Sequence, residues 1–120
     1  MLWNLKTAGC TPPASLVAHV ERRLRFALSR FSGRIRRVDV FLADENGPRG
    51  GIDKTCRIVV RLRDCEDVVA EVSDVEWVIA VDRATTRIGH STGRELSRQR
   101  ASRRSGGSAF MPRTSGAASW

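Results

Sequence analysis

Two stretches of this sequence, residues 34–43 and 55–63, alternate apolar and polar side chains, and this alternation constrains the fold more than any other feature. Successive side chains of a β-strand point to opposite faces of a sheet, so such a pattern indicates a strand with one buried face. Weaker patterns over residues 1–8 and 67–72 predict two shorter strands. The side chains of the two clear strands that we expect to face the core are Val38, Val40, Leu42, Cys56, Ile58, Val60 and Leu62.

Helical spacing marks the segment after the first predicted strand. Thr11-Pro12-Pro13 would end that strand, and Ser15 can cap a helix that runs to about Phe31, with Gly33 as a stop. One apolar stripe along this helix comprises Val17, Val20, Leu24, Ala27, Leu28 and Phe31. This stripe predicts that the helix packs on the sheet.

A second helix is predicted after Ser73-x-x-Glu76, which is the pattern of a capping box. Gly89 and Gly93 each cost this helix about 1 kcal/mol relative to alanine, so we expect its last turns to fray. Beyond about residue 97 the chain is mostly Ser, Arg, Gly and Ala, a composition typical of disorder. The predicted apolar stripe of the helix comprises Trp77, Val81, Ala84 and Ile88.

The predicted order of elements is β-α-β-β-β-α. Each strand has one apolar face and each helix one apolar stripe, so we expect an α+β fold in which two helices cover one face of a four-stranded mixed sheet. The first two strands would be parallel, joined by a right-handed crossover. The overall arrangement would be similar to a double-stranded-RNA-binding domain. We expect one domain over residues 1–97 and a basic disordered tail over residues 98–120.

The charge of the chain points to a polyanionic partner. The formal net charge is +8, and 19 of the 21 basic residues are arginine, whose guanidinium group pairs with phosphate in a bidentate way. Residues 1–93 carry a net charge of +3, whereas residues 94–120 carry +5. An arginine-rich genome would explain part of the preference for arginine over lysine, but it would not explain the charge itself. We therefore expect an RNA-binding protein.

The densest basic cluster falls on the second predicted helix. Arg83, Arg87, His90, Arg94 and Arg98 lie within about 80° of one another at 100° per residue. Like charges at this density repel, and phosphates would neutralise them. The alternative is a solvated helical face on which the charges cluster by chance.

Further candidate RNA-binding residues lie on the outward face of the sheet: Arg37, Arg57 and Arg61. On the same face Arg63 adds to their charge, and Asp39 and Glu71 dilute it. The alternative for these arginines is protection of the sheet against aggregation. The arginines of the tail can follow a phosphate backbone, or can simply keep the chain soluble. With no tyrosine and three scattered tryptophans, the sequence shows no aromatic platform for bases, so we expect structured RNA held through its backbone and shape.

Catalytic and metal-binding patterns are not found. Cys10, Cys56 and Cys65 form no CxxC pair, and neither His19 nor His90 has a Cys or Ser partner at a suggestive spacing. The thiol of Cys56 lies in an alternating apolar run and is expected to be buried and inert. We therefore expect no enzymatic activity, no cofactor, no metal and no small-molecule substrate. Neither a signal peptide nor a membrane-spanning stretch is evident, which favours the cytoplasm.

The order and spacing of several segments resemble the family of ribosome hibernation-promoting factors and ribosome-associated inhibitors. These segments are residues 16–24, residues 36–42, Asp44-Glu45-Asn46-Gly47 leading to residues 53–57, and residues 80–84. The resemblance covers roughly residues 1–96. It implies the same β-α-β-β-β-α fold and binding in the decoding region of the small ribosomal subunit, where tRNA and mRNA would otherwise lie.

The resemblance also implies inhibition of translation in stationary phase or starvation. Arg22, Arg25, Arg83 and Arg87 fall on the helices that carry the basic surface of the family. The sequence departs from its relatives at Gly89 and Gly93, where they usually have a continuous lysine-rich turn. It corresponds to the short form, without the second, dimerising domain of long members, so we expect a monomer.

Two alternatives remain open on the sequence alone. The first is a general binder of structured or double-stranded RNA, although Asp74 and Glu76 near the start of the second helix argue against the latter. The second is a protein-interaction module whose basic charge is incidental.

Overall fold

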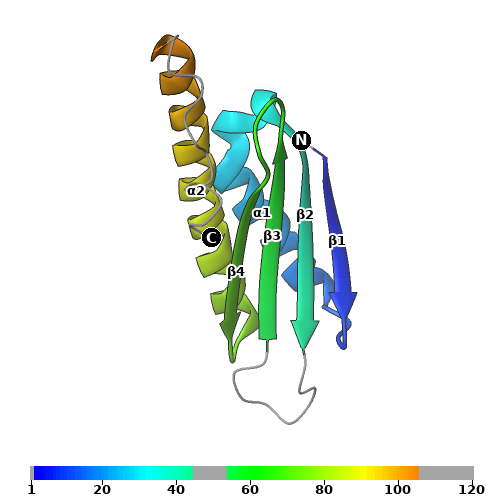
Figure 1. Ribbon diagram of the computed structural model, residues 1–120. Helices are drawn as coiled ribbons and strands as arrows, with labels where there is room; N and C mark the ends of the chain where they lie inside the picture. The colour runs from blue at the N-terminus through cyan, green and yellow to red at the C-terminus, as the bar shows by residue number, and fades with distance from the viewer. Residues whose placement is uncertain (1, 45–53, 106–120) are drawn as a thin grey trace.

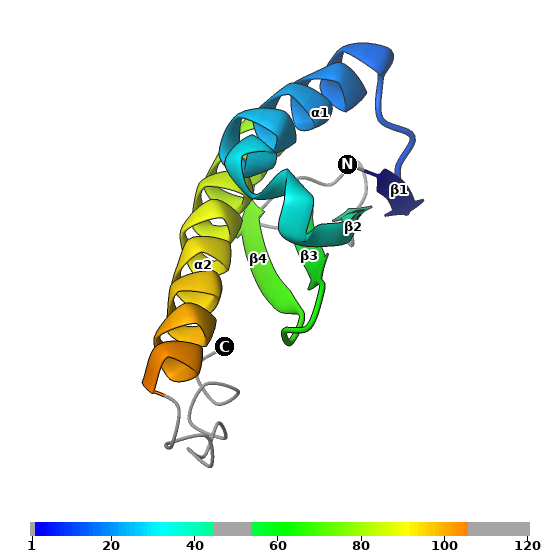
Figure 2. The same cartoon turned by 90° about the horizontal axis from the view of Figure 1, so that it is seen from above.

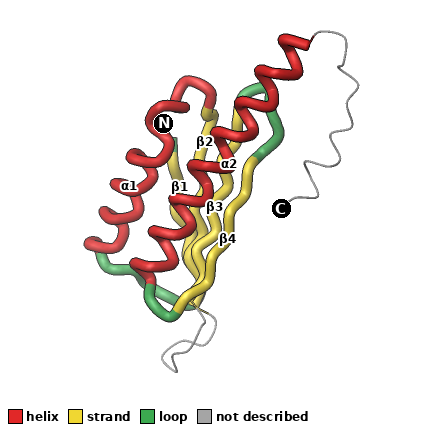
Figure 3. Tube along the Cα trace, turned by 90° about the vertical axis from the view of Figure 1, so that its left-hand side faces the viewer, coloured by secondary structure: helices red, strands yellow, loops and turns green. Residues whose placement is uncertain are grey.

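The computed structural model describes residues 2–44 and 54–105, with side chains described as far as residue 100. Its elements are β1 (Trp3–Ala8), α1 (Ala14–Leu28), the 3₁₀ helix η1 (Ser29–Arg34), β2 (Ile35–Asp44), β3 (Lys54–Leu62), β4 (Val68–Asp74) and α2 (Trp77–Ser105). Both long helices lie on the same face of the sheet (Figure 1, Figure 3). The predicted order of elements and the α+β fold class are confirmed.

The sheet has the strand order β1-β2-β3-β4, so β1 and β4 form its edges. β1 runs parallel to β2, with Trp3 opposite Val38, because α1 carries the chain back across the sheet between them. The other two pairings are antiparallel, and they place Val40 opposite Ile58 and Ile58 opposite Ala70. This register aligns the inward side chains of adjacent strands in rows, as the alternating pattern predicts.

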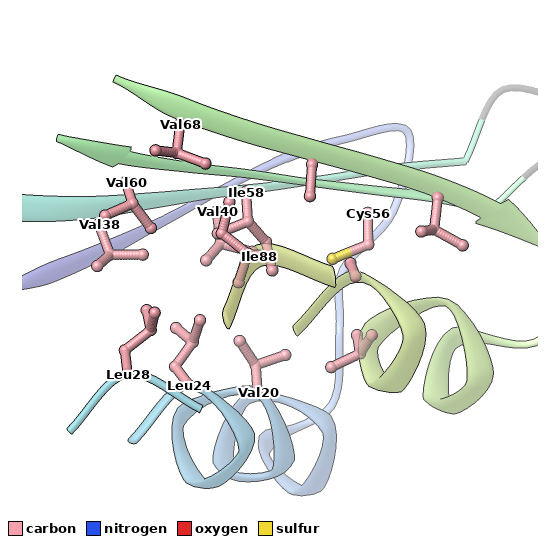
Figure 4. Close-up of a cluster of buried hydrophobic side chains, with 14 of the residues drawn as sticks. Val20, Leu24, Leu28, Val38, Val40, Cys56, Ile58, Val60, Val68 and Ile88 are labelled. Atoms are coloured by element: carbon pink, nitrogen blue, oxygen red, sulfur yellow. The ribbon is translucent and has the colours of Figure 1, made fainter. Parts of the chain in front are cut away.

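Aliphatic side chains fill the space between the sheet and the helices (Figure 4). The seven sheet residues predicted to face the core are all at most 2% exposed. From α1 the core receives Val20, Leu24 and Leu28 as predicted, and also Leu16, which the predicted stripe omitted. Burial raises the pKa of the Cys56 thiol to about 12, so this cysteine stays protonated and structural.

Both ends of the first helix differ from the prediction. Pro13, and not Ser15, precedes its first turn, and the Pro13 carbonyl accepts hydrogen bonds from the amides of Leu16 and Val17 at 3.0 and 3.1 Å. Proline suits this position because its φ angle is already close to the helical value. The α-helix ends at Leu28, and residues 29–34 continue as the tighter 3₁₀ helix.

The predicted capping box is wrong. Ser73 belongs to strand β4, and its hydroxyl lies 2.9 Å from that of Thr55 on the neighbouring strand. The carboxylate of Asp74 instead accepts hydrogen bonds from the amides of Val75 and Glu76, at 2.7 and 3.2 Å. An aspartate side chain that bonds the following amides turns the chain, so Asp74 leads the strand into α2.

Helix α2 is continuous through Gly89 and Gly93 and ends at Ser105, so the predicted helix end near residue 97 is corrected. A Cβ atom at Gly89 would lie 3.2 Å from the carbonyl oxygen of Ala27, and one at Gly93 would lie 3.3 Å from the ring of Phe31. The two glycines therefore let α2 pack closely against α1 and η1. Residues 45–53, which include part of a segment that resembles the family, and the predicted tail beyond residue 105 lie outside the described residues.

Within the described ranges, no helix combines the length and the apolar character that crossing a membrane requires.

Candidate nucleic-acid interface

The basic stripe predicted on α2 lies on the exposed surface of the helix. The residues Arg83, Arg87, His90, Arg94 and Arg98 are all exposed. The stripe begins beside the edge strand β4: the Arg87 guanidinium donates a hydrogen bond to the carbonyl of Glu71 at 3.2 Å, and Arg83 lies 3.8 Å from the carboxylate of Asp74. The packing of α2 on the sheet therefore turns these cations away from the core.

Acidic residues neutralise only part of this stripe. Glu95, one turn before Arg98, forms an ion pair with it, and Asp74 is close to Arg83. In the part of the chain that the structure describes, no carboxylate forms an ion pair with Arg87 or Arg94; Arg94 contacts the hydroxyl of Ser91 at 3.5 Å. Arg87 and Arg94 are therefore two cations of this stripe whose charge is available to a ligand.

Helix α1 lies beside α2 and adds its own arginines to the same layer of the molecule (Figure 2). Arg22 is exposed, and its guanidinium lies 3.3 Å from Nδ1 of His19. Arg25 is also exposed and forms an ion pair with Glu21 one turn away, at 2.8 Å. Such a pair on a helix surface contributes about 0.3–0.5 kcal/mol, so a phosphate can displace the carboxylate at little cost.

The contact between the two helices is itself polar, which sequence reasoning missed. Nε2 of His19 lies 2.7 Å from Oδ1 of Asp82, and Nε of Arg23 lies 3.3 Å from the same oxygen. Arg23 also donates a hydrogen bond to the hydroxyl of Thr86 at 3.2 Å. Asp82 therefore ties α1 to α2 along their outer edge, between the arginines of α1 and the basic stripe of α2.

The sheet arginines form a separate group on the open face, which no described helix covers. The carboxylate of Asp39 is only 5% exposed, and it accepts hydrogen bonds from Arg37 at 3.1 Å and from Arg61 at 2.9 Å. Arg61 also binds Asp67 at 2.8 Å. Two carboxylates thus neutralise two of the three sheet arginines that the sequence pattern proposed for RNA.

Asp39 is held in its charged form by these contacts. Burial alone would raise the pKa of its carboxyl group, but the hydrogen bonds from Arg61 and Arg37 outweigh burial and lower the pKa below its usual value.

The third sheet arginine, Arg57, is exposed, and its guanidinium lies 6.0 Å from the ring centre of Phe41. Lys6 of β1 approaches the same ring at the same distance. The predicted binding residues therefore divide into two surfaces on opposite sides of the molecule.

An aromatic side chain is exposed on the surface of the helices, although the sequence pattern predicts no aromatic platform for stacking bases. Phe26 of α1 is 79% exposed, although it lies in a helix whose other face is fully buried. The guanidinium carbon of Arg23 lies 5.8 Å from the centre of its ring. The signal was present in the sequence, because Phe26 falls opposite the apolar stripe that contains Val20 and Leu24.

Searches with protein-family models and among curated proteins give no match for this chain. Among solved structures, the N-terminal domain of protein Y from Thermus thermophilus is similar with a TM-score of 0.64 and 20% sequence identity, over 78% of this chain and 98% of that domain. A ribosomal subunit interface protein from Coxiella burnetii is similar with a TM-score of 0.62 and 16% identity, over 84% of this chain and 99% of that one. The chain therefore has the fold of these two proteins, which is the fold that the family resemblance in its sequence implies.

Proposed function

We propose that this chain is a ribosome-associated protein that binds ribosomal RNA through the outer surface of its two helices. The proposal rests mainly on the exposed arginine surface of α1 and α2. On this surface Arg87 and Arg94 have no carboxylate partner among the described residues. This surface lies on a fold shared with a ribosomal subunit interface protein. Arginines that repel one another in the free protein would be neutralised by phosphates in the complex.

The finer part of the proposal follows the family resemblance. The chain would occupy the decoding region of the small subunit and inhibit translation in stationary phase or starvation, as a ribosome-hibernation protein of the cytoplasm. Inhibition of this kind needs no catalysis, because a compact domain excludes tRNA and mRNA by filling their space. It also needs only one copy of the chain for each subunit.

Binding to purified ribosomal subunits across a salt series tests the proposal directly. We expect co-sedimentation with the small subunit at low salt and a linear decrease of log K with log salt concentration, because each phosphate contact releases counterions. A reconstituted translation reaction should lose activity over the concentration range in which the chain binds. Absence of binding at low salt, or binding that does not change with salt, would contradict the proposal.

Two controls separate this proposal from its alternatives. A general binder of structured RNA would bind a naked RNA duplex as tightly as it binds the small subunit. A protein-interaction module would bind independently of salt and would not compete with tRNA. Competition with tRNA for the small subunit is expected only if the chain occupies the decoding region.

A further inference from the structure

Phe26 is the most exposed large apolar side chain of the described residues, at 79%. It lies in the last turn of α1 and projects from the side opposite the buried residues Val20 and Leu24. A lone exposed aromatic ring on a helix contributes nothing to the core. Its surroundings therefore indicate what it contacts.

Those surroundings are cationic. Arg22 lies one turn before Phe26 in α1, and Arg30 follows in η1, where its guanidinium lies 4.7 Å from the ring centre of Phe31; both arginines are exposed. Arg23 and Arg25 also flank it, and the guanidinium of Arg23 packs against the ring at 5.8 Å. Of the other exposed apolar residues near the helices, Val78 and Ile79 lie in the first turn of α2, and Val75 lies just before it. An apolar protein surface would have to desolvate several arginines in order to reach Phe26, whereas a nucleic acid would neutralise them.

Contacts with α2 hold the side chain of Arg23 in place. Its guanidinium group contacts the carboxylate of Asp82 at 3.3 Å and the hydroxyl of Thr86 at 3.2 Å, so α2 fixes the side chain that packs against the ring. The side chain of Phe26 remains 79% exposed in spite of this contact. The guanidinium of Arg23 and the exposed ring of Phe26 together form a platform on which a flat nucleic-acid base can stack.

We propose that Phe26 is a stacking site for one unpaired nucleotide of the bound RNA, with Arg22 and Arg30 contacting the phosphates on either side of it. This inference rests on the proposed RNA-binding function and adds to it a contact with a base. Phosphate contacts carry no sequence information directly, whereas a stacked base must be free of its helix. The surface would therefore prefer RNA with a bulged or looped nucleotide over a continuous duplex.

The test uses the full chain and two RNA hairpins of equal length and charge, one fully paired and one with a single bulged 2-aminopurine. Wild type should bind the bulged hairpin more tightly than the paired one and should change the fluorescence of the 2-aminopurine. Phe26→Ala and Phe26→Leu should lose on the order of tenfold in affinity for the bulged hairpin, which corresponds to the loss of one base–aromatic stack. Phe26→Trp should keep that affinity, because it keeps an aromatic face.

The salt dependence distinguishes this inference from the proposed function. Phe26→Ala removes no cation, so it should lower affinity at every salt concentration without changing the slope of log K against log salt. Wild type that binds neither the small subunit nor either hairpin would contradict the proposed function. Wild type that binds the small subunit with a steep salt slope, and Phe26→Ala that binds the bulged hairpin equally well, would overturn the stacking site alone.

Two further outcomes also count against the base contact. If Phe26→Ala weakens binding to the small subunit but leaves both naked hairpins unchanged, the ring contacts a ribosomal protein. If it weakens the paired and bulged hairpins equally, or if wild type does not distinguish them, the ring does not recognise an unpaired base. Circular dichroism and the thermal midpoint should match wild type in each variant, because the side chain is exposed.

Discussion

Arg61 on strand β3 donates a hydrogen bond from its Nε to the buried carboxylate of Asp39 on strand β2, over a distance of 2.9 Å. Burial raises the pKa of this carboxyl group, but the hydrogen bonds from Arg61 and Arg37 outweigh burial, so the pKa of Asp39 lies below its usual value. A carboxyl group whose pKa is lower in the folded state than in the unfolded state stabilises the fold above its unfolded pKa. This contribution decreases as the pH falls through the folded pKa.

Asp39→Asn should therefore destabilise the protein at neutral pH by about 2 kcal/mol, since it removes the charge from hydrogen bonds with two arginines. The difference from wild type should decrease below about pH 4, as the wild-type carboxyl also becomes neutral. Urea unfolding at several pH values measures both effects. Asp67→Asn is the matched control: it affects only the more exposed contact with Arg61 and should cost at most about 1 kcal/mol. A difference for Asp39→Asn that stays constant down to about pH 2 would contradict this assignment.

Gly89→Ala and Gly93→Ala should have different effects on stability. Alanine is favoured over glycine within a helix by about 1 kcal/mol, so both changes gain in local propensity. At Gly89 the new methyl group would meet the backbone oxygen and Cβ of Ala27 at 3.2 and 3.3 Å, and the backbone of α1 cannot move away easily. At Gly93 it would meet only the Cζ atom at the end of the Phe31 ring, which can move aside by a small change in the χ1 angle of that side chain. We expect Gly93→Ala to be neutral or stabilising and Gly89→Ala to be destabilising. Thermal unfolding of both variants measures the difference. The reverse order would show that α1 and α2 do not pack closely at Gly89.

Arg83→Glu combined with Arg87→Glu should abolish binding to the small subunit while leaving the thermal midpoint almost unchanged. Both side chains are exposed, and surface substitutions usually shift stability by about 0.5 kcal/mol or less. The matched control is Arg36→Glu combined with Arg63→Glu, which makes the same change in net charge at exposed positions beside β2 and β3. The control should retain most of the affinity. Equal losses in both double variants would mean that net charge alone, rather than the surface of α2, determines binding.

Truncation after Ser105 should leave a folded domain, because the described core ends at Leu96. The free energy of unfolding should stay within about 0.5 kcal/mol of that of the full chain. Leu96→Ala is the complementary change: this side chain is only 4% exposed, and its truncation should cost about 2 kcal/mol or more. Loss of affinity for the small subunit in the truncated chain, together with a smaller salt slope, would indicate that the tail arginines contact phosphate. Unfolding on truncation would contradict the domain boundary.

Much of the fold was determined by the sequence alone, because alternation and helical spacing report directly on which side of each element is buried. Val38, Val40 and Ile58 face the core because a one-residue shift of register would expose a whole row of apolar side chains. The position of Arg87 on the exposed side of α2 follows from the same reasoning. These are properties of a single element, and its own residues are sufficient to predict them.

Relationships between elements were decided only by the tertiary structure. The sequence could not show that Asp39 neutralises Arg61, because these residues are distant in the chain and meet through the pairing of β2 with β3. Gly89 is unfavourable within an isolated helix, yet it permits the close approach of α1. Phe26 became a candidate contact only when its exposure and its neighbour Arg23 were known. In each case the interaction depends on how closely the packing brings two residues together. Local sequence patterns contain no information about that distance.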